Sequence, residues 1–202
     1  NDEELALRLQ LIRNHAEAVI PGMQMKVNLT NMVGGNYRLP EMEAAIAIEQ
    51  LKKLPKLLEQ RIELANYLTK GLEKLDFITT PKVREGSEHV YYLYPVKFNE
   101  NIAGLNRTKY IENINNLGIP LHKLAGGYIK PLYKDPIFAK QNEFKNGFPY
   151  TLVSENERMD YTKVSNPIIE KFHEKEFIVT AYHQPPHTKS DMDDIIKAFD
   201  KA

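Results

Sequence analysis

The sequence predicts an α/β protein of α+β-like organisation, in which a small mixed sheet is covered by helices. Three observations favour this fold class. A long stretch from Pro40 to Leu75 carries apolar residues at helical spacing, and two short segments after it are rich in aromatic and β-branched residues. The last part of the chain, 166–199, then has the pattern helix, strand, helix. Elements that mix in this way favour a sheet with helices packed on it.

The first part of the chain is predicted to be mainly helical. A short helix is expected over residues 2–15, with acidic residues in its first turn, where the positive end of the helix dipole lies. A longer helix starts at Pro40, because proline is common at a first helical position. Pro55 interrupts the apolar pattern, so we expect either two helices or one kinked helix. One apolar stripe of this element is expected to be core, and it contains Leu51, Leu54, Leu58 and Ile62.

Strand-forming residues appear after the long helix. The segments Phe77–Thr80 and His89–Phe98 predict two strands, because aromatic and β-branched side chains suit a pleated surface. Asn106 is expected to cap a helix that Gly118 closes, since asparagine accepts hydrogen bonds from the free N–H groups of a first turn. An extended segment is expected over 119–124. The order is therefore strand, strand, helix, strand.

The tail of the chain repeats a simple pattern. Asn166–Pro167 predicts the start of a helix, and the run 177–182 predicts a strand. Ser190 is expected to cap a last helix with one apolar face. These elements complete the small sheet and its cover of helices.

Composition indicates a globular protein with no general attraction to nucleic acid or membranes. Hydrophobic residues make up 42% and charged residues 27%, and 27 basic residues balance 27 acidic ones. A neutral surface as a whole does not attract nucleic acid or anionic lipid, and no apolar run of about 18 residues is present to span a bilayer. The absence of cysteine excludes disulfides, thiolate nucleophiles and cysteine zinc sites. The histidines lack the spacing typical of metal ligands, so no metal site is expected.

A polar glycine loop directly precedes the long helix. Free backbone N–H groups near a helix N-terminus favour an anion, so Asn36 and Arg38 are candidate ligands for a phosphate. The alternative is a plain turn at Gly34–Gly35, with Arg38 paired to Glu41 or Glu43 on the surface. Short glycine loops are common, and the residues alone favour the turn.

The same loop resembles the small-domain signature of the DegT/DnrJ/EryC1/StrS family of sugar aminotransferases. In that family the signature runs Gly-x-Asn-x-Arg, a small or hydroxyl residue, Glu and an Ala-Ala-Ile helix. The resemblance implies the C-terminal part of a fold-type-I transferase, with residues 1–39 completing the large domain and an interface loop and residues 40–202 forming the small domain. The matching positions are Gly34, Asn36, Arg38, Glu41, Ala44, Ala45 and Ile46.

The resemblance also implies an activity. Members of the family use pyridoxal 5'-phosphate, so we expect an aminotransferase that moves an amino group from an amino acid such as glutamate to a nucleotide-linked keto sugar, for polysaccharide biosynthesis. The opening Asn1–Leu5 looks like the stretch just after the family's cofactor lysine. No catalytic residue is therefore expected in this chain, which should be inactive alone. The family further implies a cytoplasmic homodimer with shared active sites, in which Asn36 reaches the cofactor phosphate of the neighbouring subunit. Arg38, a second candidate for cofactor binding, would contact the same phosphate, bind a phosphate of the substrate, or anchor the loop to a carboxylate.

Two other stretches resemble substrate-side segments of the family. Residues 13–15 are similar to an Arg-Asn-His segment, which makes His15 a candidate substrate contact, although a helix-terminal histidine that bonds the backbone is the ordinary alternative. Tyr128 and the Pro-Leu pair after it match the family pattern His-Tyr-x-Pro-Leu-His, so Tyr128 is the second candidate for substrate binding. Gly127 and Tyr133 replace the two histidines of that pattern, which indicates a difference in specificity.

Two alternative functions stay open at this point. Within the family, a pyridoxal phosphate-dependent sugar dehydratase has histidine in place of the cofactor lysine, and that upstream position would decide between the two activities. From a different class, the chain would be a non-catalytic interaction domain that keeps the helical scaffold. The length of the intact polypeptide discriminates between the enzyme and the interaction domain.

Overall fold

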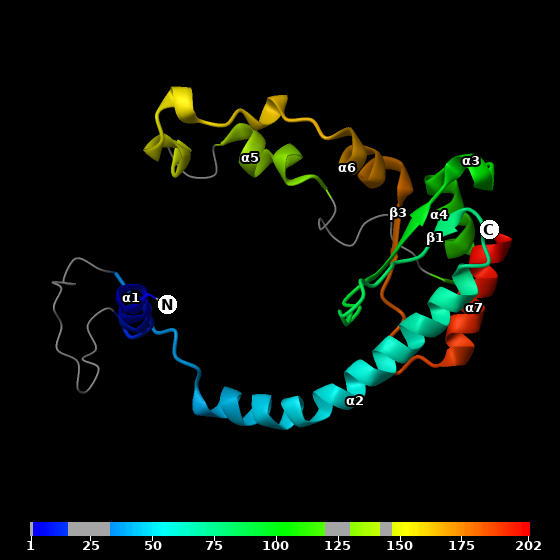
Figure 1. The fold of residues 1–202 in the computed structure, drawn as a ribbon, viewed down its shortest axis with the longest axis horizontal. Helices are drawn as coiled ribbons and strands as arrows, with labels where there is room; N and C mark the ends of the chain where they lie inside the picture. The colour runs from blue at the N-terminus through cyan, green and yellow to red at the C-terminus, as the bar shows by residue number, and fades with distance from the viewer. Residues whose placement is uncertain (1, 16–32, 120–129, 142–146) are drawn as a thin grey trace. The chain divides into compact units, whose positions relative to one another are not determined.

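The computed structural model describes residues 2–15, 33–119, 130–141 and 147–202 (Figure 1). Two compact units divide the chain, Asn1–Pro55 and Lys56–Ala202. The domain boundary that the family resemblance implies, after residue 39, stays a prediction. Among the helices of the described ranges, none combines the length and the apolar composition that a bilayer-spanning segment needs.

The first unit contains helix α1, Glu3–Arg13, and the first part of helix α2, Glu41–Leu72. Helix α2 continues through Pro55, so the structure has one helix rather than two. The prediction that Leu51 and Leu54 are core is wrong for the described chain, because their exposed fractions are 66% and 42%. Apolar spacing identifies a helix face that can be buried, but it does not identify what covers that face.

The second unit is built on a three-stranded sheet in the order β1-β2-β3. The strands are β1, Ile78–Thr79, β2, Tyr94–Phe98, and β3, Phe177–Thr180. The predicted small sheet covered by helices is confirmed, but the described strands pair only in antiparallel fashion rather than as a mixed sheet. A parallel pair needs a crossover connection that starts and ends in the same direction, whereas β2 runs opposite to both of its neighbours.

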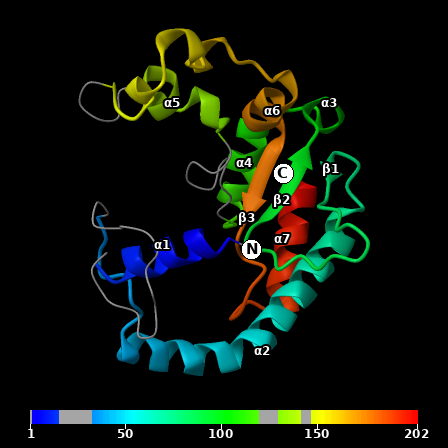
Figure 2. The ribbon, with the colours of Figure 1, turned by 60° about the vertical axis from the view of Figure 1, so that its left-hand side comes forward.

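Helices cover this sheet and link its strands (Figure 2). The connection between β2 and β3 also contains a run of single-turn helices that the sequence analysis did not predict, because such short turns have no sustained periodicity. The helices after β2 are α3, Glu100–Ala103; α4, Arg107–Asn116; η1, Leu132–Lys134; α5, Pro136–Lys140; η3, Tyr150–Leu152; η4, Glu155–Glu157; η5, Tyr161–Lys163; α6, Pro167–Lys171; the π-helical turn η6, Phe172–Glu176; and α7, Lys189–Lys201.

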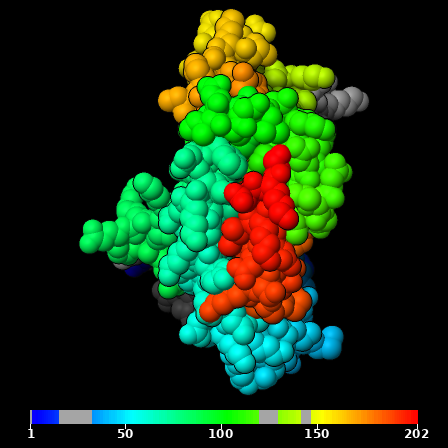
Figure 3. All heavy atoms as spheres, turned by 90° about the vertical axis from the view of Figure 1, so that its right-hand side faces the viewer, coloured from blue at the N-terminus to red at the C-terminus, as the bar shows by residue number. Residues whose placement is uncertain are grey.

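The core lies between the sheet and the helices α2, α4 and α7. On the surface, α7 lies between α4 and the second half of α2 (Figure 3). Two tyrosine hydroxyl groups in this layer have partners: the buried Tyr110 donates to the Phe199 carbonyl at 2.6 Å, and the half-buried Tyr67 donates to Asp193 Oδ1 at 2.8 Å. These bonds join α4 and α2 to α7. The largest fully buried apolar and aromatic side chains are Tyr94, Tyr110, Phe98, Phe199, Leu68, Leu72, Ile114, Ile178 and Met192.

Two predicted boundaries are corrected by the structure. The strand predicted from His89 begins only at Tyr94, because Tyr91 has a left-handed backbone with φ of 47° that no strand accommodates. The last helix begins after Thr188 rather than at the predicted cap Ser190. Thr188 forms a capping box with Asp191, which satisfies free N–H groups two residues earlier than expected.

Candidate functional site

The end of α1 and the glycine loop lie side by side, joined through their backbones. Residues 12–15 and 35–37 exchange three hydrogen bonds of 3.0 Å each, and Asn14 and Asn36 face each other as an isolated antiparallel bridge. Residues predicted separately from two segments therefore belong to one cluster. The bonds are Gly35 N–H to Ile12 O, His15 N–H to Gly35 O, and Tyr37 N–H to Arg13 O.

The chain reverses direction at the end of α1 through two polar residues. Asn14 is the C-cap, and its Nδ2 donates to the Gln10 carbonyl at 3.1 Å. His15 has a φ of 65°, in the left-handed region that asparagine and histidine visit more often than most residues. This turn sends the backbone back toward the glycine loop and leaves the His15 side chain exposed.

Asn36 and Arg38 lie against each other in the extended segment before α2. Asn36 Oδ1 accepts hydrogen bonds from the Arg38 backbone N–H at 3.4 Å and from Arg38 Nε at 3.1 Å. Neither bond uses the two N–H donors on Asn36 Nδ2 or the terminal guanidinium nitrogens of Arg38. Both side chains are exposed. Between the described residues, no ion pair joins Arg38 to Glu41 or Glu43, so the surface pairing considered as an alternative is not formed.

The cluster offers donors suited to an anion. The carboxamide N–H groups of Asn36 and the guanidinium of Arg38 are hydrogen-bond donors, and arginine also supplies a permanent positive charge. A phosphate group accepts hydrogen bonds of both kinds, so this donor set fits the phosphate of a cofactor. His15 belongs to the same cluster through the backbone bridge. Tyr128 lies outside the described residues.

The sequence analysis identified His15, Asn36 and Arg38 but missed the bridge between Asn14 and Asn36. Pairing between segments about twenty residues apart has no local periodicity that would reveal it. The only signal was the residue type, since asparagine followed by histidine after a helix favours a left-handed turn. Within the described ranges, no group of three or more histidine and carboxylate side chains is placed to hold a metal ion.

Comparison with known proteins identifies the class of protein to which this fold and cluster belong. The sequence profile of the DegT/DnrJ/EryC1/StrS aminotransferase family matches residues 1–179, and the chain belongs to this family. The match includes α1, the glycine loop and all three described strands up to residue 179. The resemblance in the glycine loop is thereby confirmed as family membership.

Two curated relatives, a transaminase and a synthase, have nucleotide-linked sugars in their names. The UDP-4-amino-4,6-dideoxy-N-acetyl-beta-L-altrosamine transaminase of Campylobacter jejuni is 33% identical over 96 residues, covering 48% of this chain and 25% of the relative. The GDP-perosamine synthase of Caulobacter vibrioides is 28% identical over 120 residues, covering 59% of this chain and 31% of the relative. The chain spans well under half the length of the curated relatives that it matches.

Solved structures of aminotransferases share the fold. The NtdA protein of Bacillus subtilis, solved with its bound cofactor PMP, superimposes with a TM-score of 0.66 at 19% sequence identity, covering 99% of this chain and 40% of that one. At this identity the likeness shows the fold alone. The predicted α/β fold class, a small sheet covered by helices, is confirmed by this likeness.

Proposed function

We propose that this chain is the C-terminal portion of a pyridoxal 5'-phosphate-dependent aminotransferase. The enzyme would transfer an amino group from an amino acid, with glutamate as the expected donor, to a nucleotide-linked keto sugar. The observation that carries the proposal is the family match over residues 1–179. The relatives that act on UDP-linked and GDP-linked sugars by name support the substrate class.

Asn36 and Arg38 would hold the phosphate of the cofactor. When bound, pyridoxal phosphate supplies an electron sink for the exchange of the amino group, and the protein supplies binding, orientation and electrostatics. The hydrogen bond from Arg38 Nε to Asn36 Oδ1 fixes the orientation of the carboxamide, so its N–H groups point away from Arg38 Nε. This arrangement supports a role for Asn36 as donor and for Arg38 as neighbouring positive charge.

The proposal extends to the assembly. The enzyme would be a cytoplasmic homodimer with shared active sites, in which Asn36 of one subunit serves the cofactor held by the other. Residues 1–39 would complete the large domain, and residues 40–202 would form the small domain. His15, on the same cluster as Asn36, and Tyr128 would contact the sugar substrate.

Replacement of Asn36 in the intact enzyme tests the cofactor role. Asn36→Ala removes one hydrogen bond to a charged group, which is worth about 1.5–3 kcal/mol. The affinity of the enzyme for the cofactor should therefore fall roughly 10- to 160-fold. The measurement is the dissociation constant of pyridoxal phosphate by equilibrium dialysis. Asn116→Ala, at an exposed asparagine that ends α4, is the matched control and should keep the affinity of the parent. Equal affinity in parent and Asn36→Ala enzymes would contradict the role.

A mixed dimer tests whether Asn36 acts across the interface. One protomer carries Asn36→Ala, and the other lacks the cofactor lysine. If Asn36 serves the neighbouring subunit, both defects fall in one active site and the other site is intact, so mixing two impaired homodimers restores activity at limiting cofactor. Confirmed subunit exchange without any recovery would show that Asn36 serves its own subunit.

The reaction itself is tested with labelled donor. The intact enzyme, incubated with ¹⁵N-glutamate and a panel of nucleotide-linked keto sugars, should yield a sugar that carries the label, detected by mass spectrometry. A deoxygenated sugar without nitrogen would identify a dehydratase and overturn the aminotransferase proposal.

A further inference from the structure

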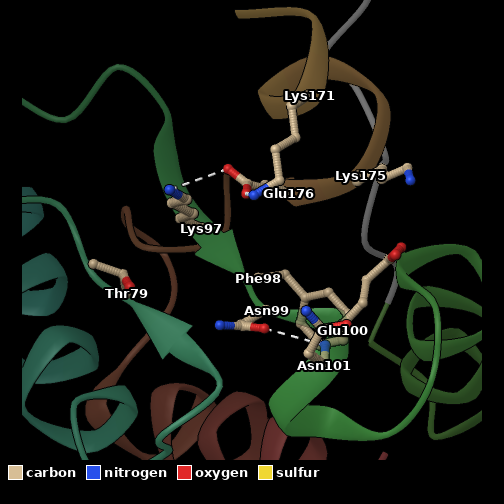
Figure 4. Close-up of a pocket in the computed structure, with 9 residues that line it drawn as sticks. All are labelled: Thr79, Lys97, Phe98, Asn99, Glu100, Asn101, Lys171, Lys175 and Glu176. Atoms are coloured by element: carbon tan, nitrogen blue, oxygen red, sulfur yellow. Dashed lines mark hydrogen bonds and ion pairs between the residues drawn. The ribbon is translucent and has the colours of Figure 1, made fainter. Parts of the chain in front are cut away.

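A polar cavity of about 330 Å³ lies at the end of strand β2, within the second unit (Figure 4). This volume is in the range of about 300–1,000 Å³ that is typical of small-molecule sites. The cavity is formed where β1, the end of β2, the start of α3 and the π-helical turn η6 meet. Its lining residues are Thr79, Lys97, Phe98, Asn99, Glu100, Asn101, Lys171, Lys175 and Glu176.

One wall of the cavity is fixed by a buried arginine. Arg107 is 6% exposed, and its guanidinium donates to the carbonyls of His173 at 2.8 Å, Glu174 at 2.6 Å and Phe177 at 3.1 Å. These bonds satisfy carbonyl groups around the π-helical turn and hold it against α4. π-helical turns are rare in proteins, and those that occur often lie at functional sites. The turn places Glu176 toward the sheet.

Glu176 joins two lysines of the cavity. Its carboxylate lies 3.1 Å from Lys97 Nζ and 2.8 Å from Lys171 Nζ, through different oxygens, and the residue is 9% exposed. Burial acts to raise the pKa of Glu176, but hydrogen bonds from Lys171 and Lys97 outweigh it and hold the pKa below its ordinary value. The three groups together therefore carry one net positive charge. Each ammonium group has three N–H donors, so one ion pair fixes a lysine without exhausting it.

Neutral donors face the same side of the sheet as Lys97. Thr79 is the direct cross-strand partner of Lys97, and Asn99 follows Lys97 by two residues, so all three side chains lie on one face. Asn99 Oδ1 accepts from the Asn101 N–H at 3.1 Å, and the amide nitrogen of Asn99 points to the side of Thr79 (Figure 4). Residues with an ammonium, an amide N–H and a hydroxyl group thus line one cavity.

We propose that this cavity binds a phosphate group, either inorganic phosphate or the monoester of a small molecule such as a sugar phosphate. Lys97 supplies charge and a donor, Asn99 Nδ2 and the Thr79 hydroxyl supply further hydrogen bonds, and Lys171 offsets the charge of Glu176. Three donors around one net positive charge suit an anion with several oxygens. The site belongs to the second unit and does not depend on the proposed function of Asn36.

Two substitutions with opposite expected effects test the proposal. Lys97→Gln removes the charged donor and should weaken binding of inorganic phosphate by at least about ten-fold. Glu176→Gln keeps the shape but removes the competing carboxylate from both lysines, so it should strengthen binding. Damage to the fold would weaken binding in both variants and cannot produce opposite signs. Lys109→Gln, which alters an exposed lysine paired to Glu112 on α4, is the control and should bind as the parent does.

The measurement is isothermal titration of the intact enzyme at low ionic strength, with pyridoxal phosphate bound at its cofactor sites and the free pyridoxal phosphate removed by dialysis. Inorganic phosphate and glucose 1-phosphate are titrated in separate experiments. Tighter binding of the ester assigns the cavity to a phosphorylated sugar, and equal or weaker binding assigns it to free phosphate; both results support the proposal provided that Lys97→Gln and Glu176→Gln move affinity in opposite directions. Unchanged affinity in both variants, loss in both, or no phosphate binding in the parent would overturn it.

Discussion

Acid should weaken the sheet of the second unit through a single histidine. His183 is 0% exposed, and its Nε2 donates to the Tyr91 carbonyl at 2.7 Å. Its Nδ1 is buried without a hydrogen-bond partner among the described residues. The ring is therefore neutral in the folded protein, because a proton on Nδ1 would place a charged and unpaired donor in the core.

The sign and size of the effect follow from linkage. Burial lowers the pKa of His183 more than the bond to the Tyr91 carbonyl raises it, and Arg61 and His89 lower it further. The unfolded histidine, with an ordinary pKa of about 6.5, takes up a proton at a pH at which the folded one does not. The contribution of His183 is thus fully present above that pH and is lost as the pH falls. Uptake of this single proton by the unfolded state lowers the free energy of unfolding by up to about 1.3 kcal/mol between about pH 7.5 and pH 5.5.

Hydrogen exchange of the intact enzyme measures this loss. The free energy of opening is obtained from the amides of β2 and β3 at both pH values, with correction for the intrinsic exchange rates. In His183→Gln, an amide nitrogen can still donate to the Tyr91 carbonyl but does not titrate. The variant should be less stable than the parent by a fixed amount at both pH values, because the glutamine packs differently. On acidification its free energy of opening should fall by up to about 1.3 kcal/mol less than that of the parent. An identical loss in parent and variant would refute the assignment of acid sensitivity to His183.

Two further substitutions test the packing of the second unit. A Cβ on Gly71 would overlap the side chain of Ile196 on α7, so Gly71→Ala should lower the free energy of unfolding by about 1–3 kcal/mol, although alanine ordinarily favours a helix over glycine. In an Ile196→Ala background, Gly71→Ala should cost less stability, because the overlapping side chain is gone. A Gly71→Ala variant more stable than the parent in urea unfolding would contradict the predicted overlap. Arg107→Met leaves the buried Phe177 carbonyl and the partly buried carbonyls of His173 and Glu174 without this donor, and should destabilise the π-helical turn by about 3 kcal/mol. Hydrogen exchange across 172–176 should accelerate, and parental protection there would show that the arginine is dispensable.

Helix starts were predictable where one side chain decides them. Asn106 and Asn166 precede helices α4 and α6 as expected, and each accepts a hydrogen bond from a backbone N–H of the first turn. These caps act within three residues, so local sequence is sufficient. The start of α7 was placed two residues late, because the capping box needs both Thr188 and Asp191 and the sequence analysis considered only a single capping residue.

Boundaries and sites that depend on distant residues were not predictable in the same way. The run from His89 has strand-forming residues, yet Tyr91 is held in a left-handed conformation by His89, which accepts from its N–H at 2.9 Å, and by His183, which lies 92 residues away in sequence. The glycine loop before a helix made Asn36 and Arg38 candidates for an anion site, whereas His15 and the choice of the anion site over a plain turn came from the resemblance to a family. The backbone bridge that gathers them required the structure.

The contact of Arg107, on α4, with the π-helical turn has a consequence for how the sequence can change. A π turn holds one more residue than an α turn, so deleting a residue from 172–176 would withdraw the carbonyls that Arg107 now contacts. Replacing Arg107 first would leave the same carbonyls without their hydrogen-bond donor, and lysine does not have the planar set of N–H donors that the guanidinium has. Neither change is tolerated before the other, so the length of this turn and the identity of residue 107 should be inherited together. They form a pair under strong epistasis, although Arg107 and His173 are 66 positions apart in the sequence.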